Sequence, residues 1–217
     1  WNVGMKPYQA GKGVPKQTKQ DVQNRKFDSD IKVDNSYRQY VRGADFEQFL
    51  VRPLQERWIK YGPWLAEPRI GAQFDNPKKI LVRQTGDSLI AAIDRSRLIC
   101  MNNVHVGVAI SEDLNVEYIL GVLNSALMNW VYHSLNPEMG EALAEVKKEN
   151  VARLPIIRES AANSRLVEAI ARHASRLEDL RLRSYNSRTE MERTQLARRE
   201  TVEMAGLNEK VFTLYEI

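Results

Sequence analysis

The chain has 217 residues, of which 43% are hydrophobic and 28% are charged, and its formal net charge is +4. This composition is typical of a globular protein and excludes an intrinsically disordered chain. No apolar run approaches the ~20 residues of a membrane-spanning helix, so we expect no membrane segment. The single cysteine, Cys100, cannot form an internal disulfide, and we expect a cytoplasmic protein. Because the chain begins at Trp1 rather than Met, we also expect it to be a piece of a longer protein.

The charge is unevenly distributed along the chain. Residues 1–26 contain six Lys or Arg and one acid, Asp21, whereas residues 61–150 contain eight bases and eleven acids. A basic arm on a neutral to acidic body favours local contact with a polyanion. A solvated, flexible terminus would have the same composition, and charge alone does not separate the two interpretations.

The N-terminal arm, residues 1–20, mixes glycine and proline with lysine and glutamine. Such a composition is typical of a loop that lies close to a ligand. No Gly-Lys pair is followed directly by Ser or Thr, so the arm does not match a phosphate-binding P-loop. The arm's candidates for contact with the phosphates of a nucleic acid are Lys6, Lys12, Lys16, Gln17 and Lys19.

Two clusters of large residues precede the predicted sheet. The first has helical spacing and predicts one or two helical turns: Phe46, Phe49 and Leu50. The second is aromatic and surrounds Gly62-Pro63: Trp58, Tyr61 and Trp64. These three rings could stack on an unpaired base or could simply pack in the core.

Residues 79–110 predict the sheet around which the chain is organised. Short apolar runs of strand type cover Ile80 to Val82, Leu89 to Ile93 and Leu98 to Met101, and alternating valines continue from Val104 toward Ile110. The run Leu89 to Ile93 is continuously apolar, which predicts a strand covered on both faces. Polar residues gather near the strand ends and turns, where they are candidates for reading bases: Arg83, Gln84, Asn102, Asn103 and His105.

Helices are predicted for the remainder. An apolar face from Val116 to Trp130 predicts one helix, capped by Asp113 or Asn115 and ending near Ser134. A short helix is predicted over residues 141–151.

The C-terminal segment has the seam of a helical hairpin or coiled coil, with residues spaced four, three, four and three apart: Leu166, Ile170, His173, Leu177 and Leu180. His173 has no neighbouring His or Cys and is interpreted as a spacer in that seam. The turn is expected near Asn186-Ser187, and a second helix over residues 191–205 is expected to be interrupted by Gly206. A terminal apolar cluster from Val211 to Tyr215 can return to the globular body.

Catalytic patterns are weak. Pro137-Glu138 followed by Glu145-Val146-Lys147 loosely echoes the metal site of many nucleases, so a magnesium-dependent nuclease using Glu138, Glu145 and Lys147 is one alternative. Against it, residues 140–150 have a helical pattern and the gap between the two parts is short. The three histidines lack metal-ligand spacing. We therefore expect no catalytic site, cofactor or metal in this chain.

Seven sequence blocks occur in an order that resembles a known family: KPYQAGKGVPKQT (6–18), VRGADF (41–46), WLAEPR (64–69), KILVRQTGDSLIAAID (79–94), CMNNVHV (100–106), YILGVLNSALMNWVY (118–132) and EVKKENVARLPI (145–156). Together they resemble the TaqI-like C-terminal specificity domain. That domain is the target-recognition part of adenine-N6 DNA methyltransferases and of fused type II restriction-modification enzymes. Arg42 and Arg69, within two of these blocks, complete the candidate DNA-binding residues.

The resemblance implies a module that recognises double-stranded DNA. Its catalytic partner would be a methyltransferase domain of the same polypeptide that uses S-adenosylmethionine, with magnesium if a nuclease domain accompanies it. We expect an α+β fold with a mixed or antiparallel β-sheet, flanking helices and a C-terminal helical hairpin. Residues 1–157 would form the DNA target-recognition domain and residues 158–217 the hairpin, in a monomer. A second alternative is a coiled-coil protein-interaction module in which the C-terminal seam binds another chain.

Overall fold

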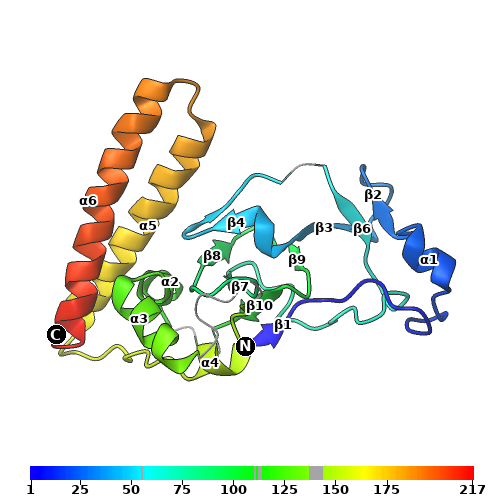
Figure 1. Ribbon diagram of the computed structural model, residues 1–217, viewed down its shortest axis with the longest axis horizontal. Helices are drawn as coiled ribbons and strands as arrows, with labels where there is room; N and C mark the ends of the chain where they lie inside the picture. The colour runs from blue at the N-terminus through cyan, green and yellow to red at the C-terminus, as the bar shows by residue number, and fades with distance from the viewer. Residues whose placement is uncertain (55, 110, 112–113, 137–143) are drawn as a thin grey trace.

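The computed structural model describes residues 1–54, 56–109, 111, 114–136 and 144–217. In this part of the chain, two four-stranded sheets and a two-stranded β-hairpin are flanked by helices. A long pair of C-terminal helices lies along one side of the molecule, and residues 19–29 lie at the opposite side (Figure 1). The predicted α+β class with a C-terminal helical hairpin is confirmed. None of the described helices has the length and apolar character needed to cross a membrane.

The first sheet is antiparallel throughout. Its strands follow the order β1 (Asn2–Val3), β10 (Val104–Gly107), β7 (Lys79–Arg83) and β8 (Ala91–Asp94). The register pairs Val82 with His105 on one side of β7 and with Ala91 on the other. Ala91 to Ile93 are buried, as the continuous apolar run predicts, and Asp94, which follows that run, is buried in an ion pair with Lys79 at 2.6 Å.

The second sheet is mixed and joins segments that are far apart in the sequence. Its order is β2 (Asp28–Ser29), β6 (Trp58–Lys60), β3 (Tyr37–Val41) and β9 (Ile99–Cys100). Strand β9 pairs in parallel with β3. The predicted strand from Leu98 to Met101 therefore belongs to the second sheet, whereas its sequence neighbours β7, β8 and β10 form the first. The short helix α1 (Lys19–Gln23) precedes this sheet.

The helical turns predicted around Phe46 to Leu50 are wrong. A short 3-10 helix, η1 (Gly43–Asp45), leads into a hairpin of β4 (Phe46–Glu47) and β5 (Leu50–Val51). Phe49 lies in the turn with a φ of 67°, outside the right-handed helical region, and its ring is fully buried. Burial of the aromatic rings therefore comes from the hairpin and not from a helical face.

The single helix predicted from residue 113 or 115 to 134 is also wrong, because it is divided in two. Helix α2 (Val116–Leu123) is capped by Asn115, whose Oδ1 accepts a hydrogen bond from Tyr118 N at 3.0 Å. Ser125 then starts α3 (Ala126–Leu135), accepting from Met128 N at 3.1 Å. This new start changes the direction of the apolar face, and Trp130, expected within that face, is 67% exposed. Asp113, the other predicted cap, lies outside the described residues.

The short helix predicted over residues 141–151 is confined to α4 (Lys148–Ala152) in the described part of that range. Before it, the chain is extended: Glu145 forms an antiparallel bridge with Thr85, and Val146 N donates to Gln84 O at 2.6 Å. Ala144 and Val146 are buried while Glu145 and Lys147 are exposed. This two-residue period is that of a strand, so the helical interpretation of Glu145 to Lys147 is wrong.

The C-terminal hairpin consists of α5 (Ser164–Asn186) and α6 (Glu190–Leu214). Its turn lies at Ser187 to Thr189, as predicted, and Thr189 caps α6 by accepting from Glu192 N at 3.2 Å. Gly206 does not interrupt α6, contrary to the prediction. A Cβ at this position would lie 2.7 Å from Cε1 of His173 on α5, so the glycine makes room for the imidazole ring between the helices.

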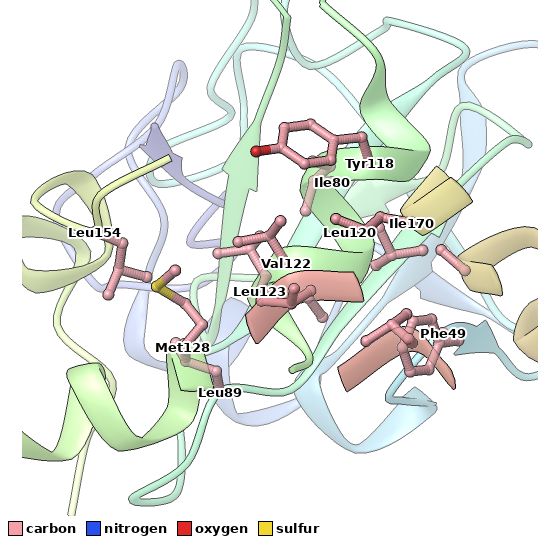
Figure 2. Close-up of a cluster of buried hydrophobic side chains, with 14 of the residues drawn as sticks. Phe49, Ile80, Leu89, Tyr118, Leu120, Val122, Leu123, Met128, Leu154 and Ile170 are labelled. Carbon is pink, nitrogen blue, oxygen red and sulfur yellow. The ribbon is translucent and has the colours of Figure 1, made fainter. Parts of the chain in front are cut away.

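The main core lies between the first sheet and the helices. Helix α2 packs between the sheet and α5, and Ile80, Leu120, Val122 and Ile170 belong to one buried cluster (Figure 2). An added Cβ at Gly121 would lie 2.7 Å from Ile170 Cγ2, so this glycine permits the close approach of α2 and α5. The cluster includes residues from both sides of the boundary expected at residue 157.

Candidate nucleic-acid interface

The basic arm is held in place by Gln17. Its amide Nε2 donates to Pro7 O and to Trp64 O, each at 2.8 Å, and its Oε1 accepts from Gln9 N at 3.1 Å. The residue is only 4% exposed. Gln17 therefore anchors the arm to the fold and does not present its amide to a ligand.

Three lysines around this anchor are exposed, namely Lys12, Lys16 and Lys19, here called the arm lysines. None of the three has an ion-pair partner among the described residues. The one acid of residues 1–26, Asp21, binds Lys26 at 2.9 Å and accepts from Thr18. These contacts, chiefly the one with Lys26, lower the pKa of Asp21 to about 2. The arm lysines therefore carry positive charge that no ion pair among the described residues neutralises. The Lys6 ammonium is held by a hydrogen bond to Gln9 Oε1 at 2.9 Å, which leaves its charge in place.

A second group of candidates comes together where β7 and β10 meet η1. Asn103 Oδ1 accepts from Gly43 N at 3.2 Å, and Asn103 O accepts from Gln84 N at 3.1 Å. Arg83 Nε donates to Gly43 O at 2.8 Å, and its Nη2 donates to Phe46 O. Arg83 and Asn103 are thus used to join η1 to the sheet. Their neighbours Arg42 and Asn102 remain exposed at this edge.

Burial changes the chemistry of Arg83. Its pKa is lowered from the usual value, first by burial and second by the positive charge of Arg52. The guanidinium lies over the Phe46 ring, with 5.8 Å between Cζ and the ring centroid. Arg83 consequently supports this edge from within.

His105 is not at the rim of the sheet. It is 3% exposed, in a strand that pairs with β1 on one side and β7 on the other, and its ring contacts the segment before α4. Its Nε2 lies 2.6 Å from Val146 O and must carry the proton, since a carbonyl oxygen only accepts. We therefore place His105 among the residues that hold the sheet to the segment before α4, and not among accessible base readers.

The remaining candidates lie at the surface in different settings. Gln84 is half-buried, with Nε2 3.4 Å from Glu145 Oε2. Arg69 is exposed and pairs with Glu67 at 2.6 Å. Four candidates thus keep side chains that are exposed or half-buried and could contact DNA. They lie at the β7–β10 edge and on the loop after β6, apart from the arm lysines in sequence: Arg42, Arg69, Gln84 and Asn102.

Two of the three aromatic residues pack into the fold. Tyr61 and Trp64 lie against a core cluster that contains Phe27 and Ile59, and Trp64 Nε1 donates to Lys60 O at 2.7 Å. Trp58 is half-buried, with the Lys32 ammonium 5.8 Å from its ring centroid. The core interpretation therefore describes Tyr61 and Trp64.

The described residues contain no group of three or more His, Cys, Asp or Glu side chains placed to hold a metal ion. Of the residues proposed for a nuclease, Glu145 and Lys147 lie in the extended segment beside Thr85, and Glu138 lies outside the described residues. Burial raises the pKa of the Cys100 thiol to about 12, which makes it a poor nucleophile.

Sequence reasoning missed two arginines, Arg52 and Arg57, which approach Arg42 after the chain reverses through the β4–β5 hairpin. Arg57 Nη2 donates to Asp45 Oδ2 at 2.5 Å, and Arg52 Nη2 donates to Ala44 O. The only signal in the sequence is that three arginines occur between β3 and β6, in a segment that also contains three acids, Asp45, Glu47 and Glu56. The convergence itself depends on the hairpin, which was predicted as helix.

Comparison with known proteins agrees with this architecture. The model of the family described as "TaqI-like C-terminal specificity domain" matches residues 38–156. Among solved structures, the chain is similar to one reported as "Structure of Type IIL restriction-modification enzyme MmeI in complex with DNA has implications for engineering of new specificities". The TM-score is 0.59 at 15% sequence identity, over 99% of this chain and 32% of that chain, so the likeness concerns the fold. No curated protein matches the sequence. The match over 38–156 covers more than half of the sequence, and the chain belongs to the TaqI-like C-terminal specificity domain family.

Proposed function

We propose that this chain recognises a specific sequence in double-stranded DNA as the target-recognition module of a restriction-modification enzyme. The family match over residues 38–156 carries the proposal. The enzyme's methyltransferase domain would lie in the same polypeptide outside this chain, would modify adenine with S-adenosylmethionine, and would use magnesium only if a nuclease domain accompanies it. The module would act as a monomer in the cytoplasm.

The charge distribution supports this function. The arm lysines are exposed and unpaired among the described residues, as phosphate contacts require. Gln84 and Asn102 lie at one end of β7 and β10 in the antiparallel first sheet, and Arg42 lies beside them at the start of η1. Arg and Lys side chains read guanine and Asn and Gln side chains read adenine, so this edge has the chemistry needed for base recognition.

The first test measures DNA binding by the 217-residue chain. Selection from a randomised duplex library should enrich one short sequence. Replacing the arm lysines together by Ala should weaken binding to all duplexes alike and lower the salt dependence by about one unit per lost phosphate contact. A matched control removes the same charge from the helical hairpin, by replacing Arg172, Arg198 and Arg199, which are also exposed. Failure to enrich any sequence would overturn the proposed function.

A second experiment separates recognition from hydrolysis. The purified chain is incubated with supercoiled plasmid and magnesium. The proposed module leaves the plasmid intact, because the catalytic groups lie elsewhere in the enzyme. Nicking that disappears with Glu145→Gln would favour the nuclease alternative instead.

A further inference from the structure

A small basic pocket lies where the segment between β3 and β6 meets the end of α5. Its volume is about 250 Å³, and Arg42, Arg52 and Arg57 line it together with Asp45 and Tyr185. Tyr185 comes from the last turns of α5 and is 50% exposed. The pocket therefore joins the edge that carries Arg42 to the C-terminal hairpin.

Positive charge exceeds negative charge in this pocket. Asp45 binds both Arg42, at 3.2 Å, and Arg57, at 2.5 Å. Arg52 donates to the Ala44 carbonyl and has no carboxylate partner among the described residues. Three guanidinium groups thus share one carboxylate.

Hydrogen-bond donors also outnumber acceptors. The Asp45 carboxylate already accepts from Arg42 N, Nε and Nη2 and from Arg57 Nη2. The Nε atoms of Arg52 and Arg57 are buried without a hydrogen-bond partner among the described residues. Because each guanidinium has five N–H donors, most donors of the three arginines lack an acceptor among the described residues.

Charged groups outside the pocket lining lie near it as well. The positive charge of Arg52 contributes, after burial, to lowering the pKa of Arg83, and the negative charge of Glu47 acts on Arg83 in the opposite direction. The net positive charge is therefore that of the lining residues themselves. Such unneutralised positive charge attracts an anion, and guanidinium groups match the oxygens of phosphate by paired hydrogen bonds.

The size of the pocket limits the ligand. Small-molecule sites usually enclose about 300–1,000 Å³ and have mostly apolar walls. At about 250 Å³, with three arginines in its lining, this pocket suits a single phosphate group and not a whole nucleotide. Arg42 belongs both to the pocket and to the β7–β10 edge, so a phosphate bound here would lie beside the proposed base-reading residues.

We propose that Arg42, Arg52 and Arg57 bind one backbone phosphate of the target DNA, and that this contact fixes the position of the sheet edge along the duplex. The inference rests on the proposed function and identifies a contact within it. Because a phosphate contact contains no sequence information, it should strengthen binding to target and non-target duplexes equally.

The decisive variant is Arg52→Gln, because Arg52 has no carboxylate partner among the described residues that would be left unpaired. We expect roughly tenfold weaker binding to target and random duplexes alike, as for loss of one charge-assisted hydrogen bond. The slope of the logarithm of the binding constant against the logarithm of the salt concentration should fall in magnitude by about one. Arg52→Lys should restore the salt dependence because it retains the charge. The control Arg97→Gln removes an exposed arginine from another loop and should change neither quantity.

A second experiment changes the DNA and compares the native chain with Arg52→Gln. Methylphosphonate substitution neutralises each phosphate of the target duplex in turn. Several positions should weaken binding by the native chain, because the arm lysines also contact phosphates, and one of these positions should have no further effect on binding by Arg52→Gln. If the native chain binds its target but Arg52→Gln keeps both affinity and salt dependence, the pocket proposal is wrong and the proposed function stands. If the native chain binds no duplex, both fail.

Discussion

His105 shows how one buried residue couples the fold to pH. Its pKa lies below the usual 6.5, mainly because of burial, while the Val146 carbonyl and the carboxylates of Glu149 and Glu145 act in the opposite direction. The proton resides on Nε2, so protonation would add a hydrogen at Nδ1, which is buried without a partner among the described residues. Charging this ring therefore costs stability.

The sign of the pH dependence follows from this shift. Below about pH 6.5 the unfolded chain binds the proton before the folded chain does, so the free energy of unfolding falls by up to about 1.4 kcal/mol per pH unit. Above that pH both states are neutral at this site and it contributes no slope. Urea unfolding at several pH values measures the effect. As the pH falls below about 6.5, the free energy of unfolding should decrease more steeply for the native chain than for His105→Gln, whose amide can still donate to Val146 O. Parallel curves for the two proteins would contradict this account.

Individual residues were predictable where their environment is local. Asn115 as a helix cap and Lys12 as an exposed base depend only on their neighbours in the sequence. Gln17 and His105 were expected at the surface because they are polar. Their burial depends on carbonyl groups of Trp64 and Val146, far along the chain, which no local pattern contains.

The edge strand β8 is completed by a side chain. Asn124 Oδ1 accepts from Ala91 N at 3.0 Å, and its Nδ2 donates to Ala91 O at 2.9 Å, in the manner of a further strand. Asn124 is 3% exposed. Replacing Asn124 by Ala leaves the Ala91 amide buried without its acceptor and should cost about 1–3 kcal/mol of stability. Chemical denaturation measures the loss.

The comparison variant for Asn124 is Asn186→Ala at the exposed end of α5, which should change stability by less than about 0.5 kcal/mol. Equal losses in the two variants would show that the contact with Ala91 is unimportant. Asn124 also explains why one predicted helix became two: its side chain is drawn to β8 at the break between α2 and α3. The helical period of residues 116–130 could not reveal that break. In the sequence, the apolar residues on both sides of Asn124-Ser125 keep intervals of three and four, although the two helices differ in direction in the structure.

Helix α6 differs from its prediction for a similar reason. Glycine inside a helix costs roughly 1 kcal/mol relative to alanine, which is why Gly206 predicted an interruption. In the structure, contact with α5 outweighs this cost, and His173 occupies the space beside Gly206 with Nδ1 2.6 Å from Glu203 Oε2. Propensity was the correct local information, but tertiary packing decided the outcome.

At the scale of the whole molecule, the C-terminal hairpin of α5 and α6 is part of the main core. Ile170 and Leu177 on α5 and Leu207 on α6 are fully buried in the cluster that contains α2 and the first sheet. Arg181 adds a polar link, since its Nη1 donates to Gln48 O in the β4–β5 turn at 2.6 Å. The C-terminal seam is therefore occupied within the chain. Its heptad-like spacing predicted a packed helix pair correctly, but the partner surface on α2 could not be identified from spacing alone.

Removing the hairpin should consequently destabilise the rest of the chain. A chain ending at Ser160 would expose the face of α2 that packs against α5. A large exposed apolar face on a helix is poorly stable in water and favours aggregation. We expect this shortened chain to aggregate or to lose cooperative unfolding, whereas the full chain should remain monomeric over a dilution series measured by light scattering.

Two substitutions on the hairpin distinguish internal packing from association between chains. Leu177→Lys places a charge in the core and should lower the melting temperature strongly without changing the oligomeric state, because Leu177 is fully buried. Val202→Lys, at a position 71% exposed on α6, should leave both the melting temperature and the oligomeric state unchanged. A dimer that forms with increasing concentration and dissociates on Val202→Lys would assign the outer face of the hairpin to a second chain. A Leu177→Lys variant as stable as the native chain would overturn the internal packing of α5 on α2.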